Sequence, residues 1–233
     1  MLKQGAAVSF ARRRAILGVA LGTAAAAFAG TAAAQPAAAQ PAAALVEGTN
    51  YARLKPPVPV ESGKKIEVIE FFSYGCPHCG ELEPILQTWL KSKPADVTFR
   101  RIPVMFQPRW ENLAKGYYVL DALGEEARLS PELFSAIHTK GAQLWNEKDF
   151  MDWAASKGLD RKKVEELWGS FGVIGKVSRA KQLAGAYNIQ SVPTIIVDGK
   201  FITGGDKLPN GHASVPIAID QLVQKARAER PKS

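Results

Sequence analysis

Two cysteines three positions apart are the residues of this sequence best suited to chemistry. Residues 76–79 read Cys-Pro-His-Cys, and Cys76 and Cys79 are the only cysteines in the 233-residue chain. A lone pair of this spacing lacks the second pair that a structural zinc site needs. Gly80 stands where the attachment site of a c-type haem needs a histidine. Disulfide chemistry is therefore the leading interpretation.

A purely structural disulfide is the plainer alternative for this pair. Closing a loop of four residues stabilises a fold by only about 2 kcal/mol in the chain-entropy model, and longer loops gain more. A chain of this size can also bury a core without such a link. A redox-active disulfide fits the spacing better than a structural one.

The N-terminal segment has the features of an export signal. Arg12, Arg13 and Arg14 precede the uncharged stretch 15–30, which small residues follow. A membrane anchor is the alternative, but the stretch is too short and too weakly apolar to span a bilayer comfortably. We therefore predict a cleaved signal peptide. The arginines partly fit a twin-arginine signal, so the export route and the cleavage site stay open.

Composition and charge limit the function of the rest of the chain. Residues 35–44 contain only Ala, Pro and Gln, which indicates a low-complexity tether. Four basic residues and no acidic residue lie in 1–34, so the net charge of the remaining chain falls from +8 to +4. This mild excess is scattered, and nucleic-acid binding is not expected.

The cysteine motif lies between a predicted strand and a predicted helix. Residues 66–72 are β-branched, aromatic or acidic and predict a buried strand, while 81–90 show helical spacing of apolar residues. Residues 97–104 predict a second strand. The order strand, motif, helix, strand predicts a βαβ unit with the motif at the switch from strand to helix.

A region without strand patterns follows, from about residue 110 to 171, and predicts three or four helices. The expected helix starts are Ser130-Pro131-Glu132 and Asp160, and the expected ends are Gly124, Gly158 and Gly172. Beyond it the sequence predicts a helix over 176–187, strands over 193–197 and 200–203 joined by a tight turn, and a helix over 214–229. An α/β sheet interrupted by a helical insertion is the simplest assembly.

Three features together resemble the DsbA-type thiol:disulfide oxidoreductases of the thioredoxin superfamily. The strand segment 68–73 runs into the motif at 76–79, a helical region follows, and Val192-Pro193-Thr194 heads a later strand. The resemblance implies an α/β thioredoxin fold with an inserted helical domain. The expected organisation is a signal peptide (1–34), a tether (35–44), a first thioredoxin part (45–108), a helical insertion (109–173) and a second thioredoxin part (174–233).

A position at the start of a helix would favour the thiolate of Cys76. If Cys76 is the N-cap, Pro77 takes the first helical position, where its missing N–H costs nothing. The amides of His78 and Cys79 then face the Cys76 sulfur at the positive end of the helix dipole. His78 can add positive charge near the sulfur, and the more shielded Cys79 suits the resolving role. A stabilised thiolate makes the disulfide more oxidising.

Two further sites follow from the resemblance. Glu70 shares a strand face with Val68 and Phe72, where a carboxylate is costly to bury, and an outward-facing carboxylate is the alternative. The resemblance implies that Glu70 lies beneath the cysteines and helps to move protons. It also implies that Pro193 is cis and lies against the disulfide, so that the Val192 backbone can pair with an extended substrate. Ordinary turn chemistry is the alternative for Pro193.

The resemblance implies a protein dithiol oxidase that donates the Cys76–Cys79 disulfide through a mixed disulfide at Cys76. The expected substrates are reduced, unfolded exported proteins in the bacterial periplasm. The expected reoxidant is a quinone-linked membrane protein resembling DsbB. We expect a monomer with no cofactor besides the redox-active disulfide.

Two alternatives remain open at this point. A reductase or isomerase could use the same dithiol, but a reductase more often has Gly-Pro between the cysteines, and about thirty residues before Cys76 are too few for an isomerase's dimerisation domain. A metal carrier could use the cysteines and one histidine. His138 and His212 have no fixed spacing to the motif, so we expect ordinary, partly exposed histidines and no metal site.

Overall fold

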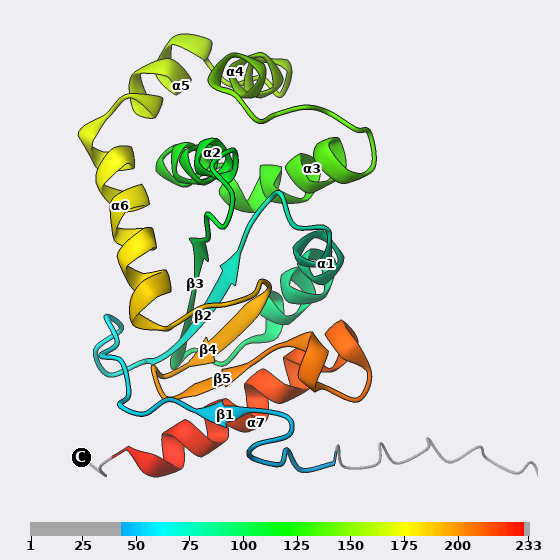
Figure 1. Ribbon diagram of the computed structural model, residues 1–233, viewed down its shortest axis with the longest axis vertical. Coiled ribbons are helices and arrows are strands. Elements are labelled where there is room, and N and C mark those ends of the chain that lie inside the picture. The colour runs from blue at the N-terminus through cyan, green and yellow to red at the C-terminus, as the bar shows by residue number, and fades with distance from the viewer. Residues whose placement is uncertain (1–42, 231–233) are drawn as a thin grey trace, which may run out of the picture. The chain divides into compact units, whose positions relative to one another are not determined.

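The computed structural model describes residues 43–230, and within them a mixed sheet forms the centre of the fold. The sheet has five strands in the order β1-β5-β4-β2-β3 (Figure 1). The strands are β1 (Ala52–Arg53), β2 (Ile66–Phe72), β3 (Val97–Pro103), β4 (Thr194–Val197) and β5 (Phe201–Thr203). The expected signal peptide and residues 35–42 of the expected tether lie outside the described residues.

Strand β2 is the central strand next to the cysteine motif. All seven of its residues are buried, as its β-branched and aromatic composition predicts. It pairs in parallel with β3 and antiparallel with β4, and the helix α1 (Pro77–Ser92) connects β2 to β3. The predicted βαβ unit is therefore confirmed, and α1 begins four residues earlier than its apolar spacing indicated. The helix also continues through Pro84.

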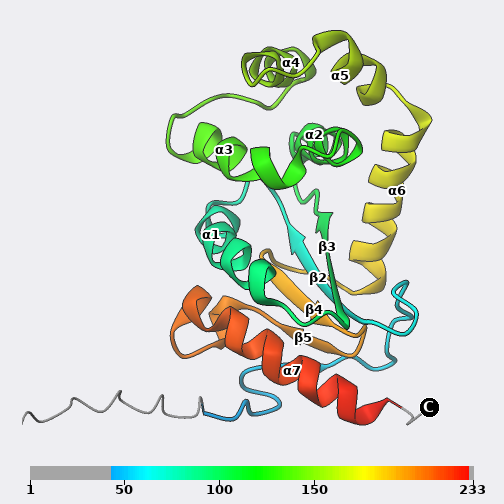
Figure 2. The same cartoon turned by 180° about the vertical axis from the view of Figure 1, so that it is seen from behind.

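Helices cover both faces of the sheet. Val68 belongs to a core cluster with Leu82 and Leu86 of α1 and with the C-terminal helix α7 (Val215–Glu229). Ile69 and Phe71 point to the opposite face, where Phe71 packs against Tyr187, just after α6 (Phe171–Ala186), with ring centroids 5.3 Å apart. Figures 1 and 2 show α6 and α1 on opposite sides of the sheet. The alternation of side chains along β2 produces these two cores.

Four helices stand between β3 and α6, within the three or four predicted. They are α2 (Trp110–Ala122), α3 (Glu126–His138), α4 (Glu147–Ser156) and α5 (Arg161–Trp168). Phe150 of α4 packs against Trp153 of the same helix and Trp168 of α5, with ring centroids 5.7 and 5.2 Å apart, so aromatic contacts join α4 to α5. Helix α6 contacts α2 and α5 as well as β3, and the expected boundary at residue 173 falls inside it. In the described part of the chain, no helix combines the length and the apolarity needed to cross a membrane.

Three of the predicted helix boundaries after β3 are wrong, and one of them is the start of α6, which begins at Phe171 instead of Lys176. Ser130 and Pro131 lie inside α3 instead of starting a helix, because Leu129, Leu133 and Phe134 are buried on both sides of the proline. Burying each such side chain stabilises the helix by about 1.5–3 kcal/mol, which together exceeds the roughly 3 kcal/mol cost of an interior proline. Gly172 lies in the first turn of α6 instead of ending a helix, because the Ser170 side chain caps that turn by accepting from the Val173 N–H.

Short 3-10 helices follow β5 and return the chain to the cysteine motif. They are η1 (Gly205–Lys207) and η2 (Gly211–Ser214). Both contact each other, and η2 contacts α1. This places a segment from the end of the chain beside the start of α1.

Candidate active site

The two cysteines occupy different environments at the start of α1. Cys76 is the N-cap with extended backbone angles (φ −100°, ψ 117°), and Pro77 takes the first helical position, so the condition under which the Cys76 thiolate would be favoured is met. Cys76 is 7% exposed, whereas Cys79 in the first turn is fully buried. Both are free thiols in this structure. Only the Cys76 sulfur is therefore placed to meet another protein.

Close packing holds the loop that presents Cys76. A side chain at Gly75 would place its Cβ 2.4 Å from Nε1 of Trp110, so only glycine fits. The hydroxyl groups of Tyr74 and Ser130 lie 2.8 Å apart, and Nε2 of His138 donates to the Tyr74 carbonyl at 2.7 Å. Helix α3 thus fixes the loop before the motif, and His138 has a structural contact that the sequence did not indicate.

The environment separates the pKa values of the two thiols. The pKa of Cys76 falls from 9.0 to about 6, chiefly because the Cys79 thiol donates a hydrogen bond to it, while burial opposes the change. The amides of Cys79 and His78 and the charge of His78 lower it further, although no side-chain cap hydrogen bond of regular geometry forms at Cys76. Burial raises the pKa of Cys79 far above its ordinary value. These shifts favour the thiolate of Cys76 and the protonated thiol of Cys79 at neutral pH.

His78 is exposed and turns towards its own helix. Its Nδ1 lies 3.0 Å from Oε2 of Glu81, one turn along α1, and this pair raises the pKa of His78. Among the described residues no hydrogen bond joins its ring to the Cys76 sulfur. His78 therefore acts on the thiolate through its charge, the weakest of the named influences on the pKa of Cys76.

The chain returns to the Cys76 sulfur from 116 residues downstream. The Cys76 Sγ lies 3.4 Å from the Val192 carbonyl oxygen, and the Val192–Pro193 peptide bond is cis, as the resemblance implies. Val192 and Pro193 line a cavity of about 410 Å³ together with His78 and His212. A second cavity of about 740 Å³ lies on the other side of the motif, between α1 and α3. Residues next to Cys76 therefore line both cavities: Pro77 lines the larger one, and His78 lines the smaller one.

Glu70 is buried under the motif in a group that we call the Arg101 cluster: Glu70, Glu83, Arg101 and Glu126. The Arg101 guanidinium lies 2.7 Å from Glu70, 2.5 Å from Glu83 and 2.6 Å from Glu126. Burial raises the pKa of Glu70 to about 7 against the opposing charge of Arg101. The charge of Glu70 in turn raises the pKa of Cys79, so the two groups are close enough to interact.

The sequence indicated Glu70, and offered Arg100, Arg101 and Arg109 as basic residues that could tune the thiolate, but it did not pair Glu70 with Arg101. Glu83 falls at helical spacing with Cys79, Leu82 and Leu86, so an acidic residue on a buried face was a usable signal. Arg101 stands directly opposite Glu70 in the β2–β3 register, which only the pairing reveals.

The fold and the dithiol define a thiol:disulfide oxidoreductase built on the thioredoxin fold. Comparison with known proteins identifies the family within this class. A sequence model of the DSBA-like thioredoxin domain matches residues 67–214, and the chain belongs to this family.

Curated relatives and solved structures agree with that assignment. The thiol:disulfide interchange protein DsbA of Bordetella parapertussis is 40% identical over 177 residues, which are 76% of this chain and 84% of that protein. The protein of the same name from Pseudomonas aeruginosa is 36% identical, with 79% and 87% covered. The crystal structure of Pseudomonas aeruginosa DsbA superposes with a TM-score of 0.75 at 36% identity, covering 79% of this chain and 95% of that one.

Proposed function

We propose that this protein donates its Cys76–Cys79 disulfide to reduced proteins after export, with Cys76 as the sulfur that substrates attack. The observation that carries the proposal is the arrangement of Cys76: an N-cap residue that keeps 7% exposure while its partner Cys79 is fully buried, with the Val192 carbonyl 3.4 Å from its sulfur. Thiol:disulfide interchange is also the activity named for the relatives.

The first step breaks the disulfide of the protein. A substrate thiolate attacks Cys76 Sγ, the Cys76–Cys79 bond breaks, and the electron pair leaves on Cys79. Because burial raises the pKa of Cys79, this sulfur takes up a proton. Glu70 has a pKa of about 7 and lies close enough to affect Cys79, so we assign it the exchange of that proton.

The second step releases the product. Another substrate thiolate attacks the substrate sulfur of the mixed disulfide, and Cys76 leaves as the thiolate. The substrate has lost two electrons as it gains a disulfide, and the protein dithiol has gained them. The low pKa of Cys76 makes it a good leaving group and favours the donating direction.

Three site residues are assigned supporting roles. Pro77 sets the first helical position so that Cys76 can be the N-cap. His78 adds positive charge near the thiolate. The Val192 backbone, held before the cis bond to Pro193, is placed to pair with an extended substrate segment.

The cellular setting of the proposal comes from the sequence and the family. The basic and apolar N-terminal segment supports a signal peptide over 1–34 and a periplasmic location, with reduced exported proteins as substrates. A quinone-linked membrane reoxidase resembling DsbB would restore the disulfide. We also assign the helices between 109 and 173 to an insertion in a thioredoxin domain formed by 45–108 and 174–233.

Equilibration of the purified protein with glutathione tests the direction of transfer. A disulfide donor should be largely reduced in a buffer where glutathione is mostly, but not fully, reduced. If the Cys76–Cys79 disulfide persists under strongly reducing conditions, as a thioredoxin-like potential requires, the protein is a reductant instead.

Alkylation of the reduced protein tests the roles of the two sulfurs. Iodoacetamide at pH 7 should modify Cys76 and leave Cys79 intact, which peptide mapping by mass spectrometry would show. Equal modification of both cysteines would contradict the assignment of Cys76 as the reactive sulfur.

A further inference from the structure

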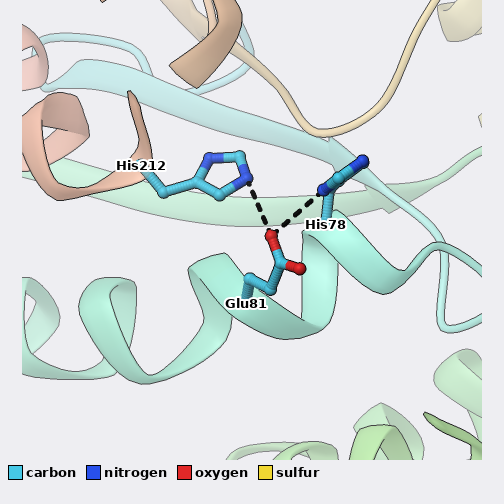
Figure 3. A group of neighbouring side chains, drawn as sticks. All are labelled: His78, Glu81 and His212. Atoms are coloured by element: carbon cyan, nitrogen blue, oxygen red, sulfur yellow. Dashed lines mark hydrogen bonds and ion pairs between the residues drawn. The ribbon is translucent and has the colours of Figure 1, made fainter. Parts of the chain in front are cut away.

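A second cluster of side chains that can bind a ligand lies beside the motif, outside the proposed chemistry. We call His78, Glu81 and His212 the histidine cluster (Figure 3). Oε2 of Glu81 lies 3.0 Å from Nδ1 of His78 and 3.7 Å from Nε2 of His212. His78 and Glu81 share a face of α1, and His212 comes from η2. Figure 3 shows both rings directed at the same carboxylate oxygen.

The types and spacing of these atoms suit a zinc-type divalent cation. Two imidazole nitrogens and one carboxylate oxygen form a set of three protein ligands that zinc sites use, with the fourth position left to water or another ligand. The three atoms lie within 4.8 Å of one another. Tetrahedral bonds of the usual zinc length would hold ligand atoms about 3.3 Å apart, so small rotations of exposed side chains would complete the geometry.

Packing holds the His212 ring in position, the one member of the cluster that comes from a distant part of the sequence. A Cβ at Gly205 would come within 2.3 Å of Nδ1 of His212, so the ring rests directly on the glycine backbone. This Nδ1 is buried and has no hydrogen-bond partner in the described part of the chain. The ring therefore presents Nε2 to Glu81, and one ligand is already oriented before any cation binds.

We propose that the histidine cluster binds a single zinc-type divalent cation at the edge of the cavity beside Cys76. His78 and His212 line this cavity together with Val192 and Pro193. A cation held there obstructs the path of an extended substrate, so zinc slows disulfide transfer. The binding goes beyond the proposed function, whereas the slowing rests on it. The proposal also revises the expectation that His212 is an ordinary histidine.

Calorimetric titration with zinc chloride tests the site. The untagged disulfide form is used, so that no thiol competes for the metal. The protein should bind one zinc ion, and both Glu81→Gln and His212→Ala should weaken binding at least about tenfold, since even loss of a residue that supports a ligand costs 10–100-fold. His138→Ala removes the third histidine of the chain, which lies outside the cluster, and should bind zinc as the parent does.

Unchanged zinc binding by Glu81→Gln would refute the proposed site. This variant should still fold, because the Glu81 side chain is exposed. Equal weakening by His138→Ala would also overturn it. The rate at which the protein oxidises a two-cysteine peptide should fall on addition of zinc, and fall less in Glu81→Gln. Equal slowing of both proteins would refute the obstruction. Absence of oxidation without zinc would count against the proposed function alone, because calorimetry needs no substrate.

Discussion

The two charged clusters beside the cysteines use similar groups in opposite surroundings. The Arg101 cluster is buried, with Arg101 and Glu70 side chains only 2% and 1% exposed, and it lies near Cys79. The histidine cluster is open to solvent, with His78 and Glu81 side chains 68% and 60% exposed, and it lies beside Cys76. Charges interact strongly in the first because water is excluded, and weakly in the second because water screens them.

This difference indicates separate tasks for the two clusters. A buried site with three carboxylates on one guanidinium holds excess negative charge, so it can keep a proton that moves during exchange. An exposed site tunes its neighbour only slightly but is free to take a ligand from solution. The reactive sulfur is therefore reached from outside, while its partner is controlled from inside.

Arg101→Met should have the largest effect, because it leaves buried carboxylates without their cation. We expect the free energy of unfolding to fall by about 3–5 kcal/mol, as measured by denaturant titration. Arg100→Met is the matched control, since Arg100 precedes Arg101 in β3 but is 29% exposed and pairs with one buried carboxylate, Glu67, and with the exposed Glu61. A loss at Arg100 as large as at Arg101 would contradict the central place of the buried cluster.

Glu70→Gln should affect exchange more than folding. Loss of the carboxyl should slow peptide oxidation by up to about 100-fold. This is the small end of the range of rate effects for a positioned proton donor or acceptor. Glu70 has a raised pKa, about 7 against 4.5, so its deprotonation in the folded protein costs stability as pH rises through this window. In the disulfide form, the free energy of unfolding should therefore fall less between pH 4.5 and 7 in Glu70→Gln than in the parent protein. Identical pH profiles and rates would remove Glu70 from the mechanism.

The pH dependence of the reduced protein should show an intermediate effect that isolates Cys76. The folded pKa of this thiol is about 6 against 9.0 ordinarily, so its contribution to stability is fully present above 9.0 and is lost as pH falls through 6. The free energy of unfolding of the reduced form should therefore increase as pH rises from 6 to 9. The disulfide form and Cys76→Ser have no such thiol and should lack it; the same slope in all three would contradict the lowered pKa.

Glu81→Gln should have the smallest effect on the zinc-free protein. The substitution removes the partner that raises the pKa of His78, so His78 carries less charge near neutral pH. The pKa of Cys76, followed by thiolate absorbance, should rise slightly, and the unfolding midpoint should not change resolvably because the pair is exposed. A shift as large as that produced by changes at the buried cluster would erase the contrast between the two sites.

Local patterns were enough for most of the elements around the motif. The apolar run of β2 and the strand pair after Pro193 were predicted from neighbouring residues, because propensity acts over a few positions. The N-cap position of Cys76 entered only as a condition, and the structure meets it. The predicted helix start at Ser130-Pro131-Glu132 was wrong because contacts distant in sequence decide this part of α3. Buried contacts on both sides of Pro131 outweigh its local preference.

The sequence by itself determined the dithiol, its place between strand and helix, and the helical region that interrupts the sheet. Only the tertiary structure decided that Arg101 lies opposite Glu70 and His212 next to Glu81. It also gave the 3.4 Å distance between the Cys76 sulfur and the Val192 carbonyl, a neighbourhood that the family resemblance implies. The first set depends on interactions within a few residues. The second set depends on strand register and on segments as far apart as Glu81 and His212, 131 residues (212 − 81), which meet only because burial of the apolar core brings the sheet and helices together.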